Sequence, residues 1–529
     1  MADYIDVLEE IDSLPDQASA EDKTSQTDKL VSFAQAHNEL FHDNNNDCYA
    51  TNKDSGETAK LESRTFKDWL SAAFYKANEK AVKSQSMNEA LATLQALARY
   101  DGEEKNVNLR VAEHDGKYYV DLCQPGNNKA IELQPGSWRV VNPDHVLFVR
   151  GESMQELPDP VRGGDFKSLW KICNISVKDR PLVLAWLIDS LRPNTPYPLL
   201  EIMGEQGSGK STTSQAIRRV IDPNACDLRG APKTTEDVFI NAGVNHVVAY
   251  ENLSHIPSPM QDGMCLLATG GGYAKRKLYT DADESVIQVK RPCLVNGIST
   301  LVTNQDLLDR TVCIECEVIK DRAQSADQWR AFAIELPFIL GAFFDLAAQA
   351  LEVLPQMKLE ANERPRMLEY CYLGMAITQV MNNDPRLFLE TFKANRRDSV
   401  GRTIESSPVC MAIIQLMKTR KELSGSASDI LKTLETFRPP ESRDTWPRSG
   451  KGMGDALRRS APALRQLDIE CYSLGKIAGN PKWVIQQKLS NQSPQSPQVM
   501  DKNEISRTSG HSGLDIENNI EPAPWEIEI

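Results

Sequence analysis

The stretch that decides the fold reads Gly204-Glu205-Gln206-Gly207-Ser208-Gly209-Lys210-Ser211. It fits the phosphate-binding loop pattern G-x-x-x-x-G-K-[ST], in which glycines let the backbone curl so that its N–H groups point at phosphate oxygens. An apolar run at 199–203 precedes it, and a run compatible with a helix, 212–220, follows. The pattern requires this context, because the amino terminus of the helix adds a partial positive charge. The stretch therefore predicts a nucleotide-binding α/β domain.

We expect this loop, extended by Thr212, to bind ATP together with Mg²⁺. Lys210 is placed to neutralise the β- and γ-phosphates, and the Ser211 hydroxyl is placed to hold the metal ion. The alternative is a glycine-rich turn with a chance lysine. The flanking strand and helix disfavour it.

The composition is that of a globular protein with an uneven charge distribution. The chain has 529 residues, enough for roughly three or four domains, and a net charge of −14. Residues 1–60 carry 14 acids and 4 lysines, and residues 491–529 carry 7 acids and 2 bases. Because the acidity lies at the two ends, it does not exclude DNA binding by the body of the chain.

The cysteines and apolar stretches point to no disulfide framework and no membrane span. The 11 cysteines are scattered, and the C-x-x-C of Cys313 and Cys316 lacks a second pair or a nearby histidine, so we interpret both as structural residues of a strand at 311–318. The N-terminus has no basic region of a signal peptide. The apolar stretch 338–351 is short and interrupted, so we expect a cytoplasmic protein without membrane contact.

Shifts in pattern along the chain predict its domains. The expected regions are a disordered acidic N-terminus (1–28, with a short helix at 4–11), an N-terminal α+β module (29–155), an ATPase core (156–325), a helical domain (326–424), a winged-helix DNA-binding domain (425–488) and a disordered acidic tail (489–529).

Within the N-terminal module, apolar stripes at helical spacing predict that residues 29–100 are helical. Residues 105–150 alternate as strands, with an Asp-Gly hairpin turn at 115–116 and a meander that continues to 146–149. Three aromatic residues there offer a surface for stacking nucleic-acid bases, but packing within a small sheet is the favoured interpretation. They are Tyr118, Tyr119 and Trp138.

The C-terminal pattern is typical of a winged helix. A helix at 427–434 is followed by a Pro-rich break, a basic helix at 452–467 and short strands at 469–472 and 483–485. We expect three arginines of the basic helix to contact DNA. They are Arg458, Arg459 and Arg465.

Downstream of the loop, polar residues follow apolar strands in the order that an ATPase needs. Glu251 and Asn252 end one strand, and an acid there holds the Mg²⁺ water shell and polarises the attacking water. Asn296 ends the next strand and suits a sensor of the γ-phosphate. Arg310 is placed to reach the nucleotide of a neighbouring subunit. Singly, these are an ordinary strand-end acid, a turn asparagine and a surface arginine; together they favour hydrolysis.

A hairpin is expected between the acid and the sensor. Residues 270–290 combine a glycine-rich root, a basic strand and an acidic turn. Its basic residues Lys275, Arg276 and Lys277 can grip a DNA backbone. A solvated strand edge, or contact of Arg276 with nucleotide, remains open.

These motifs carry a family resemblance. The order GEQGSGKST, AYENLS, TGGGYAKRKLYTD, RPCLVNGI and DLLDR resembles the AAA+ ATPases of phages and integrated mobile elements, which are related to superfamily 3 helicases and primase–helicase C-terminal domains. The resemblance covers roughly residues 30–488. It implies a P-loop AAA+ core with a parallel sheet flanked by helices, in an oligomeric, hexameric ATPase that translocates on DNA during replication.

One departure from the family stands at the acidic motif. Members usually have Asp before Asn, and this chain has Glu251, whose arm is longer by one methylene. Two functions therefore stay open. The first is an ATP-driven motor or helicase on single-stranded or forked DNA, and the second is an ATP-dependent DNA-binding switch, such as an origin-assembly or defence factor. A small-molecule kinase has little support, since no lid with an acceptor site follows 220.

Overall fold

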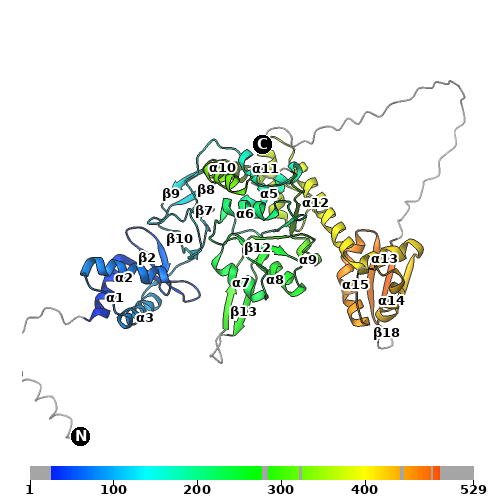
Figure 1. The fold of residues 1–529 in the computed structure, drawn as a ribbon, viewed down its shortest axis with the longest axis horizontal. Coiled ribbons are helices and arrows are strands. Elements are labelled where there is room, and N and C mark those ends of the chain that lie inside the picture. Colours follow the sequence, from blue (N-terminus) through cyan, green and yellow to red (C-terminus); the bar gives the residue numbers. More distant parts are fainter. Residues whose placement is uncertain are drawn as a thin grey trace, which may run out of the picture. The chain divides into compact units, whose positions relative to one another are not determined.

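The structure is a computed structural model that describes residues 25–276, 284–320, 324–440, 442, 446–477 and 480–488. These residues form two compact units, each shown in Figure 1. The first contains the chain up to Asn108 with residues 126–128 and 144–152, and the second contains residues 109–125, 129–143 and 153 onward. The expected helix at 4–11 and the tail at 489–529 lie outside the described residues.

The first unit is a small mixed sheet covered by helices. Its four-stranded sheet has the order β3-β2-β1-β4, and a separate parallel pair joins β5 to β10. The elements are α1 (Gln26–His37), β1 (Asn38–His42), β2 (Cys48–Asn52), β3 (Thr58–Lys60), α2 (Arg64–Asn78), α3 (Ser84–Tyr100), β4 (Glu103–Glu104), β5 (Val107–Asn108) and β10 (Leu147–Phe148).

The expectation that residues 29–100 are helical is wrong for 38–60. The apolar stripes of α2 and α3 are buried as expected, but three strands lie between them and α1. Phe41 of β1 stacks on Tyr49 of β2, with ring centroids 5.5 Å apart. The carboxylate of Asp43 accepts the backbone N–H groups of Asn45 and Asp47 at 2.9 Å and closes the turn between these strands.

An antiparallel sheet opens the second unit. Its order is β6-β7-β8-β9, and the expected hairpin turn is present, with positive φ at Asp115 (51°) and Gly116 (74°) as a two-residue turn of this kind requires. The expected continuation at 146–149 is wrong, because β10 pairs with β5 in the first unit. The strands are β6 (Val111–His114), β7 (Lys117–Asp121), β8 (Ala130–Gln134) and β9 (Ser137–Val141).

The aromatic residues of this sheet pack inward. Tyr119 is buried and donates to the Glu132 carboxylate at 3.0 Å, while Trp138 donates from Nε1 to Asp345 at 2.7 Å. Asp345 belongs to α10 (Ser325–Val353), so the sheet is joined to the second unit rather than to residues 29–108. Packing, rather than base stacking, is therefore the role of Tyr119 and Trp138.

A four-stranded parallel sheet lies at the centre of the second unit and gives it a mixed α/β fold, as expected. Its order is β12-β15-β11-β16, and every neighbouring pair is parallel. The carboxyl ends of all four strands therefore meet at one edge. The elements are β11 (Leu199–Met203), α6 (Lys210–Ile221), α7 (Thr235–Val244), β12 (Val248–Leu253), α8 (Ser258–Thr269), β13 (Gly272–Arg276), β14 (Glu284–Gln288), β15 (Cys293–Gly297), α9 (Gln305–Leu308) and β16 (Thr311–Glu315).

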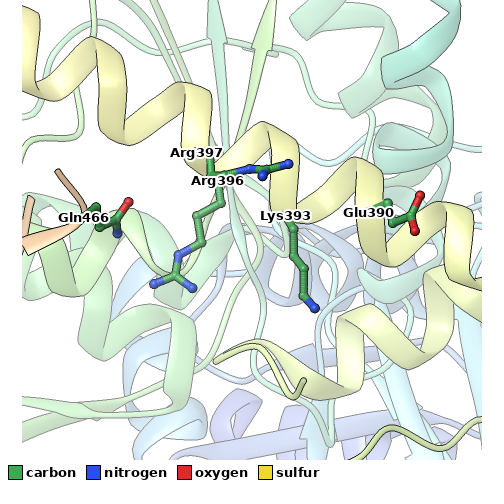
Figure 2. A pocket seen from close by; sticks show the side chains of 5 residues that line it. All are labelled: Glu390, Lys393, Arg396, Arg397 and Gln466. Carbon is green, nitrogen blue, oxygen red and sulfur yellow. The ribbon is translucent and has the colours of Figure 1, made fainter. Parts of the chain in front are cut away.

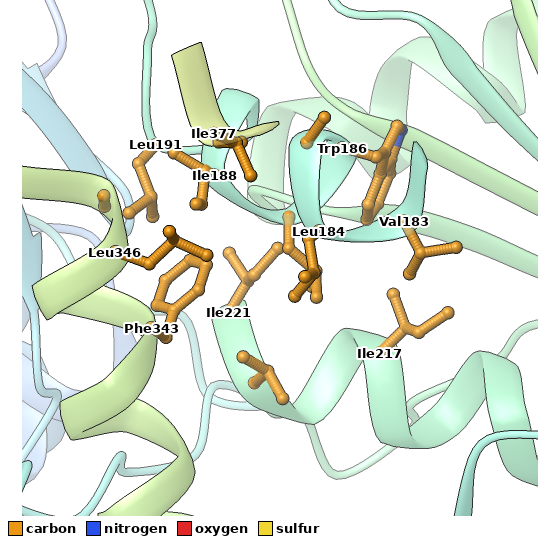
Figure 3. Packing of buried hydrophobic residues seen from close by; sticks show 14 of the residues in the cluster. Val183, Leu184, Trp186, Ile188, Leu191, Ile217, Ile221, Phe343, Leu346 and Ile377 are labelled. Atoms are coloured by element: carbon orange, nitrogen blue, oxygen red, sulfur yellow. The ribbon is translucent and has the colours of Figure 1, made fainter. Parts of the chain in front are cut away.

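Helices pack on α6 and form the largest core. Figure 3 shows Leu184 and Ile188 in one cluster with Ile221 of α6 and Phe343 of α10. By length and composition, Ser325–Gln356 is the one helix in the described part of the chain that is apolar enough to cross a membrane, and half of its most apolar window is buried in the protein. The further helices are α4 (Lys167–Ile172), α5 (Arg180–Asp189) and α11 (Leu368–Val380), with 3₁₀ turns at Val177–Asp179, Leu354–Gln356 and Glu435–Phe437.

The C-terminal part combines helices with a three-stranded antiparallel sheet of order β17-β19-β18. The expected helices and both expected strands are present, and β17 adds a third strand that was not predicted from the sequence. The elements are α12 (Pro385–Ser406), α13 (Pro408–Thr419), β17 (Glu422–Ser426), α14 (Ala427–Leu434), α15 (Gly450–Arg465), β18 (Ile469–Ile477) and β19 (Asn480–Gln487).

Candidate nucleotide site and nucleic-acid interfaces

The loop between β11 and α6 has a conformation that only glycine-rich sequence adopts. Gly207 (φ 89°) and Gly209 (φ 72°) are in the left-handed region, and Gly209 caps the amino terminus of α6. A Cβ atom on Gly204 would lie 2.3 Å from Ser208 Oγ. Asn174 braces the loop by donating from Nδ2 to the Ser208 carbonyl at 2.8 Å and to the Glu317 carbonyl at 2.6 Å. Contacts within the protein therefore hold the loop in this conformation.

The side chains of the loop suit a phosphate ligand. Lys210 Nζ donates to the Glu205 carbonyl at 3.3 Å across the loop, and Ser211 and Thr212 lie half-buried in the first turn of α6. Glu205 and Gln206 are exposed. An ammonium group, a hydroxyl group and the free N–H groups of a helix terminus are the donors that a triphosphate needs, so the residues present fit such a group.

Asn296 connects the loop helix to the acidic strand. Its Oδ1 accepts the backbone N–H of Asn252 at 2.9 Å, and its Nδ2 donates to Ser214 Oγ at 2.9 Å. Ser214 in turn donates to the Lys210 carbonyl at 2.7 Å. Asn296 is fully buried, and both ends of its amide hold protein groups. Three of the residues expected to act together, Lys210, Asn252 and Asn296, therefore lie within one hydrogen-bonded array.

Glu251 lies next to this array at the carboxyl end of β12. Its side chain is half-buried, and its backbone N–H donates to the Arg229 carbonyl at 2.8 Å. Asn252 follows in the left-handed region (φ 54°), where the register between β12 and β15 shifts. Together with the Ser211 hydroxyl, the Glu251 carboxylate offers the hard oxygen ligands that Mg²⁺ prefers.

Arg310 lies at the opposite end of the sheet. Its carbonyl accepts the N–H of Leu199, the first residue of β11, at 2.8 Å. The loop begins after Met203, so about 13 Å of strand separates the two ends, at about 3.3 Å per residue. The Arg310 guanidinium pairs with Asp306 at 3.5 Å, and Asp306 also pairs with Arg366 at 2.6 Å. The structure therefore does not bring Arg310 to the loop of its own chain.

The arginines of α15 face solvent. The opposite face of this helix is buried through Met453, Leu457 and Leu464. Three arginines on the other face are exposed. One of them, Arg458, pairs with Asp455 at 2.7 Å and lies 5.7 Å from the Trp483 ring. The three arginines are Arg458, Arg459 and Arg465.

Comparison with known families agrees with the resemblance read from the motifs. Residues 166–382 match the actinomycete integrative conjugative element replication protein, and residues 409–497 match the C-terminal domain of that protein, RepA. The two matches together cover more than half of the 529 residues. The chain belongs to the RepA family. It is a replication protein of a mobile element, as the motif order predicted.

Two solved structures that are similar to this RepA-family chain are a helicase and the C terminal region of NrS-1. "SCCmec type IV Cch - active helicase" is 10% identical with a TM-score of 0.43, and covers 85% of this chain and 92% of its own. The NrS-1 C terminal region is 10% identical with a TM-score of 0.37. The matched region covers 87% of this chain and 98% of the NrS-1 chain. No curated protein matches the sequence. TM-scores this low add nothing to the family assignment.

The hairpin of the RepA-family chain is only partly described. β13 and β14 pair antiparallel from Gly272 opposite Gln288 to Arg276 opposite Glu284. Tyr273 stacks on Phe239 of α7, with centroids 5.4 Å apart, and fixes the root of the hairpin. Lys277 and the side chains of Lys275 and Arg276 lie outside the described residues.

A basic cleft in this RepA-family chain was missed in the sequence. It has a volume of about 580 Å³ and is lined by α12 and the residue that follows α15 (Figure 2). Lys393 and Arg397 are exposed one turn apart, and Arg396 pairs with Asp309 at 2.6 Å. The only sequence signal was the helical spacing of these three cations. Glu390 and Gln466 complete the lining.

Proposed function

We propose that the chain is an ATP-hydrolysing oligomeric motor that acts on DNA during replication of a mobile element. The observation that carries this proposal is the array Asn252–Asn296–Ser214–Lys210 at the carboxyl edge of the parallel sheet. It joins the phosphate-type loop to the acidic strand end. Ligands of open α/β sheets bind at this edge.

ATP with Mg²⁺ is the proposed cofactor. The N–H groups of 204–212 and the Lys210 ammonium would bind the phosphates, Ser211 would hold the metal ion and Glu251 would hold its water shell. When bound, Mg²⁺ would neutralise part of the negative charge of the phosphates. Glu251 orients the attacking water as a base, and Asn296 keeps Glu251's strand aligned with α6 through its bonds to Asn252 and Ser214.

The position of Arg310 supports the proposal of an oligomer. Because this arginine lies at the amino edge of the sheet, it serves the nucleotide of a neighbouring copy in a ring, which we propose to be a hexamer. Asp306 holds it in place at 3.5 Å. A site with loop, metal and arginine is thus complete only between two copies.

We propose DNA contacts on three surfaces of an AAA+-type motor. The order α13, β17, α14, α15, β18, β19 is that of a winged helix, and the arginines of α15 contact phosphates there. Lys275, Arg276 and Lys277 of the hairpin bind single-stranded or forked DNA within the ring. Lys393 and Arg397 on α12 make further contacts with the phosphates of the DNA. This work takes place in the cytoplasm, away from membranes.

A second candidate function is an ATP-dependent DNA-binding switch that assembles at an origin or in defence. Glu251 favours it, because a longer acid displaces the base by one methylene and slows hydrolysis. The Asn296 amide, held by protein groups at both ends, favours it too. ATP binding does not separate the two functions, whereas strand displacement on a forked duplex does.

The first test is ATP hydrolysis with and without single-stranded DNA. We expect stimulation by DNA that is lost in Lys210→Ala, with exposed Lys76→Ala of α2 as the matched control. Hydrolysis that DNA does not change would contradict the motor. Tight ATP binding without turnover would favour the switch.

A further inference from the structure

A glutamate lies in the middle of the strand that leads to the loop. Glu201 of β11 is fully buried, and its neighbours in the parallel ladder are Val295 of β15 and Cys313 of β16. The other residues of β11 are apolar, as expected for a central parallel strand. Burying a carboxylate costs free energy unless hydrogen bonds compensate it. A carboxylate at this buried position is therefore expected to have a specific structural or functional role.

The carboxylate of Glu201 holds a loop 100 residues away. Its Oε1 accepts the backbone N–H of Leu301 at 2.6 Å and that of Val302 at 3.3 Å. Its Oε2 is buried and has no N–H or O–H donor among the residues that the structure describes; the neighbouring polar group is the Cys313 thiol. Burial raises the pKa of Glu201, and the two backbone donors oppose that rise.

A second buried side chain holds the next two residues of the same loop. Oε1 of Gln261, in α8, accepts the N–H of Thr303 at 2.9 Å and that of Asn304 at 2.8 Å. Four consecutive N–H groups, 301–304, are therefore satisfied by two side chains from β11 and α8. This loop connects Asn296 on β15 to α9 and Arg310.

We propose that Glu201 is a positioning residue that couples the phosphate-type loop to Arg310. The strand β11 ends in the loop, and its Glu201 side chain holds the segment that sets the start of α9. A shift of β11 on nucleotide binding thus moves Arg310 toward or away from the neighbouring copy. The coupling rests on the proposed function, because its output is hydrolysis between two copies.

Two substitutions of Glu201 distinguish the effect of losing the hydrogen-bond acceptor from the effect of changing the side-chain volume. Glu201→Gln keeps the size and one carbonyl oxygen for Leu301 and Val302. Glu201→Met keeps the approximate volume and removes both acceptors, which leaves two buried N–H groups unpaired. Glu132→Met is the control, because Glu132 is also a buried strand carboxylate but lies in the β6–β9 sheet.

Hydrogen exchange of the loop tests the tether without requiring hydrolysis. In the full chain, Glu201→Met is expected to speed exchange at Leu301 and Val302 by about tenfold, the equivalent of one lost hydrogen bond of about 1.4 kcal/mol. Glu201→Gln and Glu132→Met are expected to leave these amides as protected as in the wild type. Unchanged protection in Glu201→Met would overturn the proposal. If that variant does not fold, faster exchange in Glu201→Gln would overturn it.

Kinetics test the coupling. We expect Glu201→Met to lower kcat about tenfold with KM within about twofold, and to add nothing to the loss in Arg310→Ala. A loss that multiplies with that of Arg310→Ala, or that appears in KM alone, would contradict the coupling. A wild-type chain without hydrolysis would refute the proposed function, while exchange would still decide whether Glu201 holds the loop.

Discussion

The two ends of the parallel sheet differ in what they offer a nucleotide. At the carboxyl edge, Lys210 of the loop, Ser214, Asn296 and Asn252 are joined by hydrogen bonds into one array, and Glu251 lies next to it. At the amino edge, Arg310 lies outside that array and pairs with Asp306, which also pairs with Arg366. One edge is the candidate nucleotide site, and the other carries Arg310, whose side chain is mostly buried.

Under the proposed function, this difference means that one copy carries two halves of a site which do not meet within it. β11 connects them, since its first residue bonds to the Arg310 carbonyl and its last precedes the loop. We therefore expect changes at the carboxyl edge to affect binding or chemistry in the same copy. Changes at the amino edge should act on a neighbour.

The largest effect is expected at the carboxyl edge itself. Lys210→Ala removes the ammonium group that neutralises the transferred phosphate, so kcat/KM for ATP should fall about 1000-fold. Steady-state hydrolysis measures this, with Lys76→Ala as the control. A variant with wild-type turnover would show that the loop does not hold the reacting nucleotide.

Glu251 separates binding from chemistry at the same edge. Glu251→Gln keeps the shape and removes the base, so kcat should fall about 100-fold while nucleotide affinity changes little. Single-turnover hydrolysis and titration with a fluorescent ATP analogue measure the two quantities. An equal loss in both would place Glu251 in binding rather than in water activation.

The basic surfaces should affect DNA and leave the nucleotide edge intact. Arg459→Ala with Arg465→Ala removes two phosphate contacts, so DNA affinity should fall about tenfold and the salt slope should decrease by about 2. Lys393→Ala with Arg397→Ala should lower affinity less, because Glu390 already lines their cleft. Fluorescence anisotropy at several salt concentrations measures both pairs, with exposed Arg330→Ala as the control. An unchanged dependence of DNA affinity on salt concentration would show that these residues do not contact the DNA backbone.

The smallest effect concerns stability at acid pH, away from both edges. Burial lowers the pKa of His246 to about 4, with Asp222 opposing and Arg291 assisting the shift. A lowered folded-state pKa means that the stability is complete above the unfolded value of 6.5 and is lost as the pH falls toward 4. Between pH 7.5 and pH 5 this contribution costs about 2 kcal/mol.

His246→Gln should remove this acid sensitivity, because glutamine can donate to the Ser190 carbonyl that His246 contacts at 2.8 Å. Burial raises the pKa of Asp189 to about 6, which acts with the opposite sign and stabilises the fold as the pH falls. Urea unfolding of variant and wild type at the two pH values therefore isolates the histidine. If the stability of variant and wild type changed equally between the two pH values, His246 would not be the source of the acid sensitivity.

Local patterns in the sequence predicted those features that depend on near neighbours. The glycine spacing of 204–209 dictates a left-handed turn at Gly207 and Gly209, and Asp115-Gly116 dictates its hairpin. The family followed from the same motifs, because they lie within the matched regions. Asn296 was identified as a strand-end residue, but its bonds to Asn252 and Ser214 needed the structure.

Features set by distant partners were missed. Strands β1 to β3 depend on pairing with one another rather than on their own apolar pattern, and the Asp43–Asp47 turn was the one local signal. β17 is short and polar, and it is a strand because β19 pairs with it about sixty residues later. In the sequence, Glu201 is a single acid in an apolar run, and nothing near it indicates its role. Its partners are loop amides 100 residues away.

The central claim is that two copies complete one site, and mixing two inactive variants tests it most directly. Lys210→Ala lacks the loop function, and Arg310→Ala lacks the arginine, which should cost about 1000-fold in kcat. Hydrolysis is measured for each variant alone and for the equimolar mixture. We predict that the mixture hydrolyses ATP well above the sum of the two, because Arg310 of the Lys210→Ala copy serves the intact loop of its neighbour. A mixture no more active than that sum would contradict the account.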